Sequence, residues 1–324
     1  MDILILGGTA FLGRAIATDA LARGHHVVCA ARGSAAVAAG AELVRVDRDE
    51  DHALAPLTGR RWDCVVDVSR HPGQVRRAVR DLESEHWVYI SSSNAYARFD
   101  RLEQTEDATV LDPLVGDVMT DMSVYGPAKV ACERLLREAP ASATIIRSGL
   151  IGGTGDASGR VGYYPWRFAH PTGPDVLVPP DLDAPIALVD VHDLAAWCVT
   201  TAERRLDGTF NATGPTLTLG DVLEASREVS GSTAVARPVP AEVLELHGIG
   251  SWMGAPSLPL WIDEPTWRYF ATLDTSAARA EGFTTRPVAE TLRSALADEQ
   301  SRSTPRPSGL TDAEERALRL ALAV

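Results

Sequence analysis

Residues 2–13 read Asp2-Ile3-Leu4-Ile5-Leu6-Gly7-Gly8-Thr9-Ala10-Phe11-Leu12-Gly13. The apolar run at 2–6 is typical of a buried parallel strand, and the apolar residues after the glycines recur at helical spacing. A glycine-rich turn between a strand and a helix is the context expected of a dinucleotide-binding loop. In such a loop Gly7 permits the tight turn, Ala10 occupies the position where the pyrophosphate approaches the backbone, and Gly13 lets the helix pack on the sheet.

The alternation of strand and helix patterns continues along the chain. Further strands are predicted at 27–30, 43–46, 64–68, 87–90 and 144–147, and helices at 73–83 and 124–138. Strands that alternate with helices form parallel sheets covered on both faces. We therefore predict an α/β fold with a Rossmann-type, doubly wound parallel sheet.

A change in composition near residue 150 predicts a second, smaller and mostly helical lobe. Residues 163–185 are rich in proline and aromatic side chains, and the stretch after 219 is largely helical in pattern. The predicted nucleotide-binding domain comprises 1–151 and about 183–215. The predicted substrate-binding lobe comprises about 152–182 and 216–297, and 298–324 are predicted to form a linker and a C-terminal helix.

The composition of the 324 residues narrows the class of protein. The net charge of −13 disfavours binding to a phosphate backbone, so no nucleic-acid partner is expected. No run of about 18 uncharged apolar residues exists, so no membrane span is expected. Four scattered cysteines and the lack of a basic leader predict a reducing, cytoplasmic location. No metal site is predicted, because Asp193 beside His192 is better explained as a helix cap.

The end of the second strand predicts which cofactor is bound. An acid usually stands there to hold the free ribose 2′-hydroxyl of NAD, but this chain has Ala30-Ala31-Arg32. Arg32 could pair with a 2′-phosphate and Arg14 could assist, so NADP is predicted and NAD is the alternative. Asp47, at the end of the third strand, is placed to bind the adenine amino group. The alternative explanation, that these are surface arginines and a loop-capping aspartate, stays open.

Tyr125 and Lys129 form the sharpest signal in the sequence. They stand four residues apart, which places them on one face of a helix. Lys129 is the one lysine among 31 basic residues, so it is a candidate for work that arginine does not do. A neighbouring ammonium stabilises an ionised phenolate, and a serine at the end of the preceding strand could donate to the same substrate oxygen.

These motifs resemble the extended or atypical short-chain dehydrogenases/reductases, in the NAD-dependent epimerase/dehydratase family. The resemblance covers about 1–297 and depends mainly on 7–13, 91–96 and 125–129. It implies that Ser92, four residues before Tyr96, orients the substrate oxygen, with Ser93 as the next candidate. It also implies that Tyr125 exchanges a proton and that Lys129 assists. The cofactor-binding residues predicted from the motifs and the resemblance are Gly7, Thr9, Ala10, Phe11, Leu12, Gly13, Arg14, Arg32, Asp47, Tyr125 and Lys129.

Two departures from the family pattern limit what the resemblance implies. Dehydratases of the family carry an Asp-Glu pair after the serine, where this chain has Ser93-Asn94, so water elimination is disfavoured. The family's Arg-Pro-Gly near the nicotinamide is replaced by residues 147–149, which read Arg-Ser-Gly.

The predicted function is an NADP-dependent oxidoreductase that acts on a small-molecule carbonyl or alcohol. The alternatives are a sugar-nucleotide epimerase with retained NAD and a non-catalytic NADP-binding protein. A homodimer through the helices at 73–83 and 124–138 is a further hypothesis. It would use an apolar stripe that could equally face the sheet, made of Val75, Ala78, Val79 and Leu82.

Overall fold

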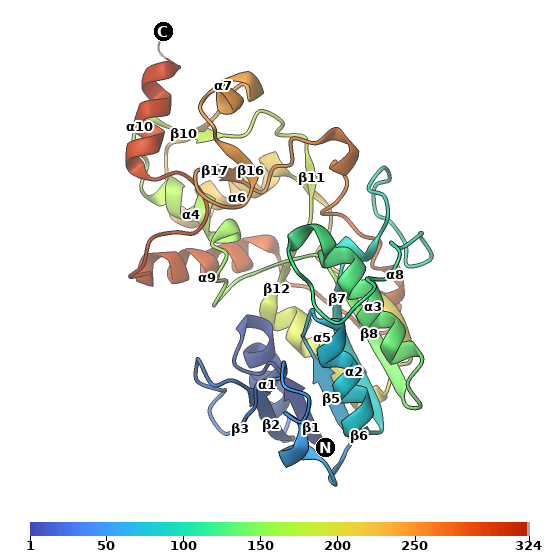
Figure 1. The fold of residues 1–324 in the computed structure, drawn as a ribbon. Coiled ribbons are helices and arrows are strands. Elements are labelled where there is room, and N and C mark those ends of the chain that lie inside the picture. The colour runs from blue at the N-terminus through green and yellow to red at the C-terminus, as the bar shows by residue number, and fades with distance from the viewer. Residues whose placement is uncertain (323–324) are drawn as a thin grey trace.

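The computed structural model describes residues 1–322, and its largest unit is a seven-stranded parallel sheet (Figure 1). The strand order is β13-β8-β7-β5-β1-β2-β3, which is the doubly wound order expected from the sequence. The predicted fold class is therefore confirmed. The strands of this sheet are β1 (Asp2–Leu6), β2 (His26–Ala31), β3 (Glu42–Arg45), β5 (Cys64–Asp67), β7 (His86–Ser92), β8 (Ser142–Ser148) and β13 (Gly208–Ala212).

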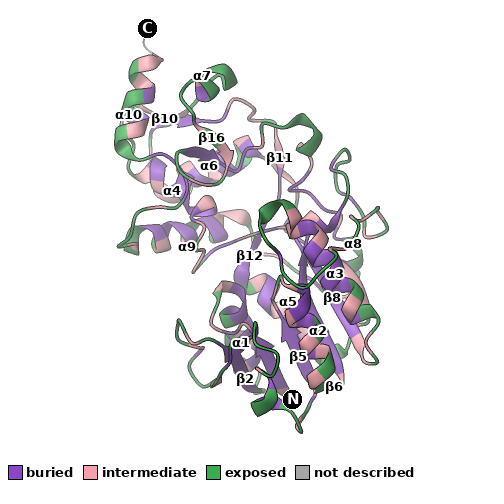
Figure 2. Cartoon of the chain, in the orientation of Figure 1, coloured by how far each residue is buried: buried purple, intermediate pink, exposed green. Residues whose placement is uncertain are grey.

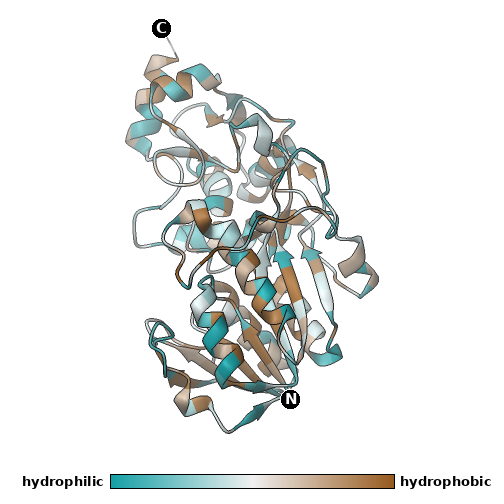
Figure 3. Cartoon of the chain, turned by 45° about the vertical axis from the view of Figure 1, so that its right-hand side comes forward, coloured by the Kyte–Doolittle hydropathy of each residue, from teal (hydrophilic) through white to brown (hydrophobic). Residues whose placement is uncertain are grey.

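Helices cover both faces of the sheet, and each face has its own apolar core. Helices α1 (Phe11–Ala22) and α5 (Val191–Arg204) share one core with Ile3 and Ile5 of β1. Helices α2 (Pro72–Asp81) and α3 (Tyr125–Arg137) cover the other face, and that core contains Leu4 and Leu6. Successive side chains of a strand point to opposite faces, so the uniformly apolar β1 is buried from both sides. Figure 3 shows the contrast between the apolar strands and the hydrophilic outer surfaces of the helices.

The apolar stripe on α2 faces the sheet. Val75 and Ala78 are fully buried in the core beneath the helix, Leu82 is nearly so, and Val79 packs against the same core. The outer side of α2 carries Arg80, whose guanidinium pairs with Asp51 and Asp81. The alternative that the apolar stripe faces the sheet is confirmed. The stripe therefore gives no support to a dimer through these helices.

The second lobe is a helical cluster that includes short two-stranded sheets (Figure 2), and strand residues such as Val176 and Leu258 are buried in its core. Its centre consists of α4 (Arg160–Ala169), α6 (Leu219–Ser230) and α9 (Val288–Ser301), which pack against one another. The remaining helices and strands are β4 (Arg61–Trp62), β6 (Glu83–Ser84), β9 (Leu150–Gly152), β10 (Asp175–Val178), β11 (Pro185–Ile186), β12 (Leu188–Asp190), β14 (Leu217–Thr218), β15 (Val235–Pro238), α7 (Ala241–Leu246), β16 (Gly250–Trp252), β17 (Ser257–Pro259), α8 (Ser276–Ala280) and α10 (Asp312–Ala321).

The chain returns to the first domain inside the stretch expected to form the second lobe. Ala278 of α8 and Phe283 are buried in the core beside β1, and the Phe283 ring lies 5.7 Å from that of Trp197. Helix α9 then runs on to Ser301, past the residue where a linker was expected to begin. The expected C-terminal helix is present as α10, and Thr311 caps it in a capping box with Glu314.

The expectation that Asp193 caps the helix after β12 is wrong. The helix begins at Val191, and its cap is Asp190, whose side chain accepts a hydrogen bond from the His192 backbone N–H. Asp193 lies inside the first turn and instead pairs with Arg286, at 2.8 Å. The apolar pattern of the helix did not reveal that it starts two residues earlier.

The four cysteines are all buried free thiols, as expected. Burial raises the pKa of the Cys29 thiol to about 11, so it stays protonated and unreactive at neutral pH. Over residues 1–322, no helix combines the length and the apolar character that crossing a membrane requires.

His86, the first residue of β7, is an imidazole held neutral inside the domain. Its Nδ1 lies 2.8 Å from the Ser142 hydroxyl and its Nε2 lies 2.9 Å from the Thr144 hydroxyl. Burial is the main cause that lowers the pKa of His86 from 6.5 to about 4.

This depressed pKa predicts a loss of stability at mildly acidic pH. Above pH 6.5 the imidazole is neutral in both states and its contribution is fully present; between pH 6.5 and 4 only the unfolded chain takes up the proton. The free energy of unfolding should therefore decrease by about 2 kcal/mol when the pH is lowered from 7.5 to 5. His86→Gln should remove this contribution to the pH dependence of stability. Urea unfolding at both pH values measures it, with exposed His52→Gln as control. Equal pH dependence in wild type and His86→Gln would contradict the prediction.

Candidate active site

The turn between β1 and α1 is shaped so that glycine is required. Gly7 has a φ of +99°, which disfavours any residue with a Cβ. A Cβ at Gly13 would overlap the carbonyl oxygen of Gly7, so α1 approaches the turn as closely as backbones can. Ala10 is the N-cap and is exposed, and it makes no side-chain capping bond. The first N–H groups of α1 therefore point outward with no side-chain cap, as a phosphate site requires.

The other residues predicted for the cofactor lie around this turn and the ends of the next strands. Thr9 and Phe11 are half-buried and Leu12 is buried. Arg14 is exposed on α1, and its guanidinium lies close to Gly155 in the loop after β9. Asp47 accepts a hydrogen bond from the Asp49 backbone N–H, at 3.1 Å, so it does cap a loop. Its contact with adenine stays a prediction.

Two arginines and no acid stand at the end of β2. Parallel pairing of β2 and β3 places Arg45 directly beside Ala31, and the Arg45 guanidinium covers Gly33. Arg32 is the next residue after β2. Both arginines are exposed, and neither forms an ion pair within the described residues 1–322. Arg45 was missed by sequence reasoning, although the strand order would have placed it here.

Lys129 is fixed at the carboxyl ends of β5 and β7. Its Nζ donates to the carbonyl oxygens of Ser69 (2.8 Å) and Ile90 (2.7 Å). The ammonium lies 4.9 Å from the centre of the Tyr89 ring and 5.7 Å from that of Tyr125. An ammonium has three donors, so two hold it in place and one is left for a ligand.

Ser69 is a second residue that sequence reasoning missed. Its carbonyl accepts from Lys129 and from the Tyr89 hydroxyl, at 3.0 Å. Its backbone N–H donates to the Asp67 carboxylate at 2.8 Å, and its hydroxyl lies beside the same carboxylate and helps to lower the pKa of Asp67.

The start of α3 packs on the turn that follows β7. A Cβ at Gly126 would overlap the carbonyl oxygen of Asn94, so glycine allows this close approach. Tyr125 is thereby held beside the turn that begins at Ser92. The Ser92 hydroxyl oxygen accepts from the Asn94 backbone N–H (3.2 Å) and side-chain amide (3.0 Å). With these acceptor positions filled, the serine proton is free to be donated to a ligand.

Arg147 serves the framework of the site. Its guanidinium binds Glu133 of α3 through two bonds of 3.0 and 2.8 Å, and lies 4.7 Å from the centre of the Tyr96 ring. Burial opposes ionisation of Glu133, but hydrogen bonds from Arg147 and Ser91 outweigh burial and lower the pKa of Glu133. This buried pair ties α3, which carries Tyr125 and Lys129, to β8.

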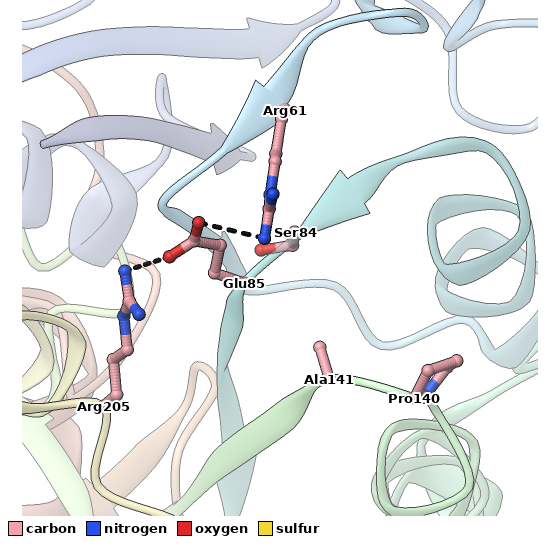
Figure 4. A pocket seen from close by; sticks show the side chains of 6 residues that line it. All are labelled: Arg61, Ser84, Glu85, Pro140, Ala141 and Arg205. Atoms are coloured by element: carbon pink, nitrogen blue, oxygen red, sulfur yellow. Dashed lines mark hydrogen bonds and ion pairs between the residues drawn. The ribbon is translucent and has the colours of Figure 1, made fainter.

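A hollow at the opposite end of the sheet is a poor candidate site (Figure 4). It has a volume of about 440 Å³ and lies at the amino ends of β7 and β8. Glu85 pairs with Arg61, at 3.1 Å, and with Arg205, so no unpaired charge faces a ligand. Ligands of doubly wound sheets bind at the carboxyl ends of the strands. The lining residues are Arg61, Ser84, Glu85, Pro140, Ala141 and Arg205.

Comparison with known families agrees with this assignment of the nucleotide site. Residues 3–82 match the model of the NAD dependent epimerase/dehydratase family, a family of enzymes. This match confirms the resemblance expected from the motifs. It includes the glycine turn and β2, while Tyr125 and Lys129 lie outside it. A search of curated proteins found no match to this sequence.

Several solved structures share the fold over nearly the whole chain. A protein from Burkholderia cenocepacia that is described as an epimerase without an assigned substrate has a TM-score of 0.72 and 19% identity. The alignment covers 93% of this chain and 98% of that protein. UDP-N-acetylglucosamine 4-epimerase from Bacillus cereus has a TM-score of 0.69 and 16% identity, with 94% and 98% covered. UDP-glucose 4-epimerase from Thermus thermophilus, in complex with NAD, has a TM-score of 0.66 and 18% identity, with 93% and 99% covered. At these identities the likeness shows the fold.

Proposed function

From its match to the NAD dependent epimerase/dehydratase family, we propose that this protein is an NADP-dependent oxidoreductase acting on a carbonyl or alcohol of a small molecule. The observation that carries the proposal is the position of Lys129. It is bound to two carbonyls at the carboxyl ends of β5 and β7, beside the Tyr125 ring. Packing of the apolar core does not require an ammonium at that point. Proton transfer at Tyr125 gives a reason for one, because the positive charge favours the ionised phenol.

The residues present fit a dinucleotide that carries a 2′-phosphate. The turn at 7–13 offers backbone N–H groups and space for the pyrophosphate. Arg32 and Arg45 would bind the 2′-phosphate, because both are cationic and unpaired with an acid in residues 1–322. Lys129, which has one N–H left for a ligand, would bind the nicotinamide ribose. The bound cofactor would supply or accept the hydride.

The side chains around Tyr125 would handle the proton. Tyr125 would donate a proton to the substrate oxygen during reduction and accept one during oxidation. Lys129 would stabilise the phenolate through its positive charge. Ser92 would donate a hydrogen bond to the same oxygen, since its acceptor positions are already used by Asn94.

A sugar-nucleotide epimerase with retained NAD is the second candidate. The fold likeness to UDP-sugar epimerases favours it, and one of those structures contains NAD. The absence of an acid at Ala31 and Arg32, where NAD would need one, argues against it. Mass spectrometry of the nucleotide that copurifies distinguishes the two candidate functions. Stoichiometric NAD supports the epimerase. NADP(H), or no bound nucleotide, supports the oxidoreductase, whose cofactor exchanges with the solution.

We expect the protein to prefer NADPH to NADH. Arg45→Ala should weaken NADPH binding about 10-fold, because a charge-assisted bond to the 2′-phosphate is lost, and should leave NADH binding unchanged. Arg32→Asp should shift the preference towards NADH, since a carboxylate repels the phosphate and accepts from the ribose hydroxyl. Fluorescence titration with both nucleotides measures this, with exposed Arg316→Ala on α10 as control. Tighter binding of NADH by the wild type would refute the cofactor assignment.

A further inference from the structure

Arg160, the first residue of α4, differs from the other arginines of the second lobe. Most of them are ion-paired, among them Arg167, Arg286 and Arg319. The rest, such as Arg293, are exposed. Arg160 is the one arginine of that lobe, within the described chain, that is neither exposed nor ion-paired. A half-buried guanidinium that forms no ion pair has free donors, so a ligand is expected to bind it.

The Arg160 guanidinium is held in a fixed orientation. It lies 5.1 Å from the centre of the Trp252 ring, and its Nε donates to the Ser158 hydroxyl at 3.2 Å. The Asp156 carboxylate is near but beyond ion-pair distance, and it accepts from the Ser158 backbone N–H instead, at 2.8 Å. The two terminal nitrogens of Arg160 therefore form no hydrogen bond within residues 1–322.

Trp252 is itself fixed from several sides. Its φ is +63°, a conformation that is strained for a bulky residue and must be held by its surroundings. Its backbone N–H donates to the Trp261 carbonyl at 2.7 Å, and its ring meets the edge of Phe270 at 5.4 Å. The surface that supports Arg160 is thus rigid, which keeps the free guanidinium edge in one place.

The guanidinium lies towards the turn that follows β7, because Trp252, beside which it lies, packs against the apolar cluster that contains Tyr96. Burial lowers the pKa of Arg160, and the nearby Asp156 carboxylate acts in the opposite direction. The group stays charged at any physiological pH. A substrate whose oxygen meets Tyr125 would therefore extend towards Arg160. The planar fork of terminal N–H groups matches two oxygens of a carboxylate or phosphate.

We propose that Arg160 binds an oxyanion of the substrate, a carboxylate or a phosphate ester, that lies within a few bonds of the carbon oxidised or reduced beside Tyr125. The inference deepens the proposed function and depends on it, because it identifies the class of substrate for the same site. A neutral alcohol or ketone would leave the guanidinium without a partner.

The test is calorimetric titration of the full-length protein, with and without saturating NADP⁺, using matched anionic and neutral probes. Malonate against malonamide tests the carboxylate, and glycerol 3-phosphate against glycerol tests the phosphate ester. At least one anion should bind, and its affinity should fall roughly 10- to 100-fold in Arg160→Gln. Arg160→Lys keeps the charge and loses the fork, so it should recover only part of the affinity. Arg293→Gln removes an exposed arginine of the same lobe and should change nothing.

Each outcome decides the inference. Loss of malonate binding alone in Arg160→Gln identifies a carboxylate, and loss of glycerol 3-phosphate binding alone identifies a phosphate ester. Equal affinities in wild type and Arg160→Gln, neutral probes that bind as well as anions, or no anion binding at all would overturn it. NADPH titration of the same proteins keeps the two proposals apart: a wild type that binds NADPH but no anion refutes the inference alone, whereas one that binds no nucleotide refutes the proposed function.

Discussion

Replacing Tyr125 with Phe is expected to lower turnover by roughly 10²–10⁴-fold and to leave folding and NADPH binding intact. The change removes one hydroxyl from a half-buried ring and keeps its packing near Lys129. Without that hydroxyl the proposed proton donor to the substrate oxygen is lost. The measurement is NADPH oxidation with a panel of carbonyl compounds that includes keto acids and phosphorylated ketones, to find a substrate first.

Two further variants support the interpretation of that result. Tyr269→Phe removes a hydroxyl from another half-buried tyrosine and should keep wild-type turnover. Lys129→Arg should lower turnover, because a planar guanidinium does not fit the two carbonyls that hold the ammonium at 2.7 and 2.8 Å. If Tyr125→Phe turns over at nearly the wild-type rate, Tyr125 is not the proton donor and the catalytic assignment is wrong. A wild type that binds NADPH but turns over no compound of the panel would instead favour a non-catalytic NADP-binding protein.

Replacing Arg167 with Met is expected to destabilise the protein by about 3–5 kcal/mol, because it removes one of the two cations that pair with a buried carboxylate. Arg167 of α4 is fully buried, and its Nε lies 2.8 Å from Glu315 of α10, which is also fully buried. Its terminal nitrogens bind the Asp312 carboxylate at 2.8 Å and the Leu310 carbonyl at 2.7 Å. This one side chain therefore joins the C-terminal helix to the centre of the second lobe.

Urea unfolding measures the loss, and a double variant tests its cause. Arg167→Met combined with Glu315→Leu removes both charges and should recover much of the stability, because an apolar pair is no worse than a buried ion pair. As a control, Arg316→Met replaces an exposed arginine of α10 and should change the free energy of unfolding by less than about 0.5 kcal/mol. A loss below about 1 kcal/mol in Arg167→Met would mean that Glu315 finds sufficient compensation in Arg319, 2.9 Å away.

The sequence predicted those parts of the fold that local patterns determine. The predicted strand at 2–6 is the observed β1, and the helix predicted at 124–138 is observed at Tyr125–Arg137. The first is a short continuous apolar run, the second has apolar residues at helical spacing, and both end at clear signals. The short strands of the second lobe were not predicted, since pairs such as β16 with β17 depend on contacts between distant segments. The sequence also did not reveal Asp190 as the helix cap. Strand β12 ends at Asp190 and α5 begins at Val191, so no turn residue marks the boundary.

The same distinction explains which site residues could be predicted. Ser92, Tyr125 and Lys129 stand in recognisable spacings, and the structure places them around the carboxyl end of β7. Arg45 comes close to Arg32 through the register of two strands, and Arg160 comes close to Trp252 through packing between distant segments of the second lobe. No short motif records such contacts. Their signal is visible once the structure shows which arginines lack an acid.

The return of α8 to the first domain has a consequence for the chain as it leaves the ribosome. The sheet face beneath α1 is completed only by α5 and by Ala278 and Phe283, which are made long after β1 to β8. At about 5–20 residues per second, translation from residue 150 to 283 takes on the order of ten seconds. During that time the apolar strands of this face stay exposed, because α5, Ala278 and Phe283 have not yet been synthesised. A ribosome that stalls or terminates in this interval would release a chain prone to aggregate, and holding chaperones would act on this protein at that stage.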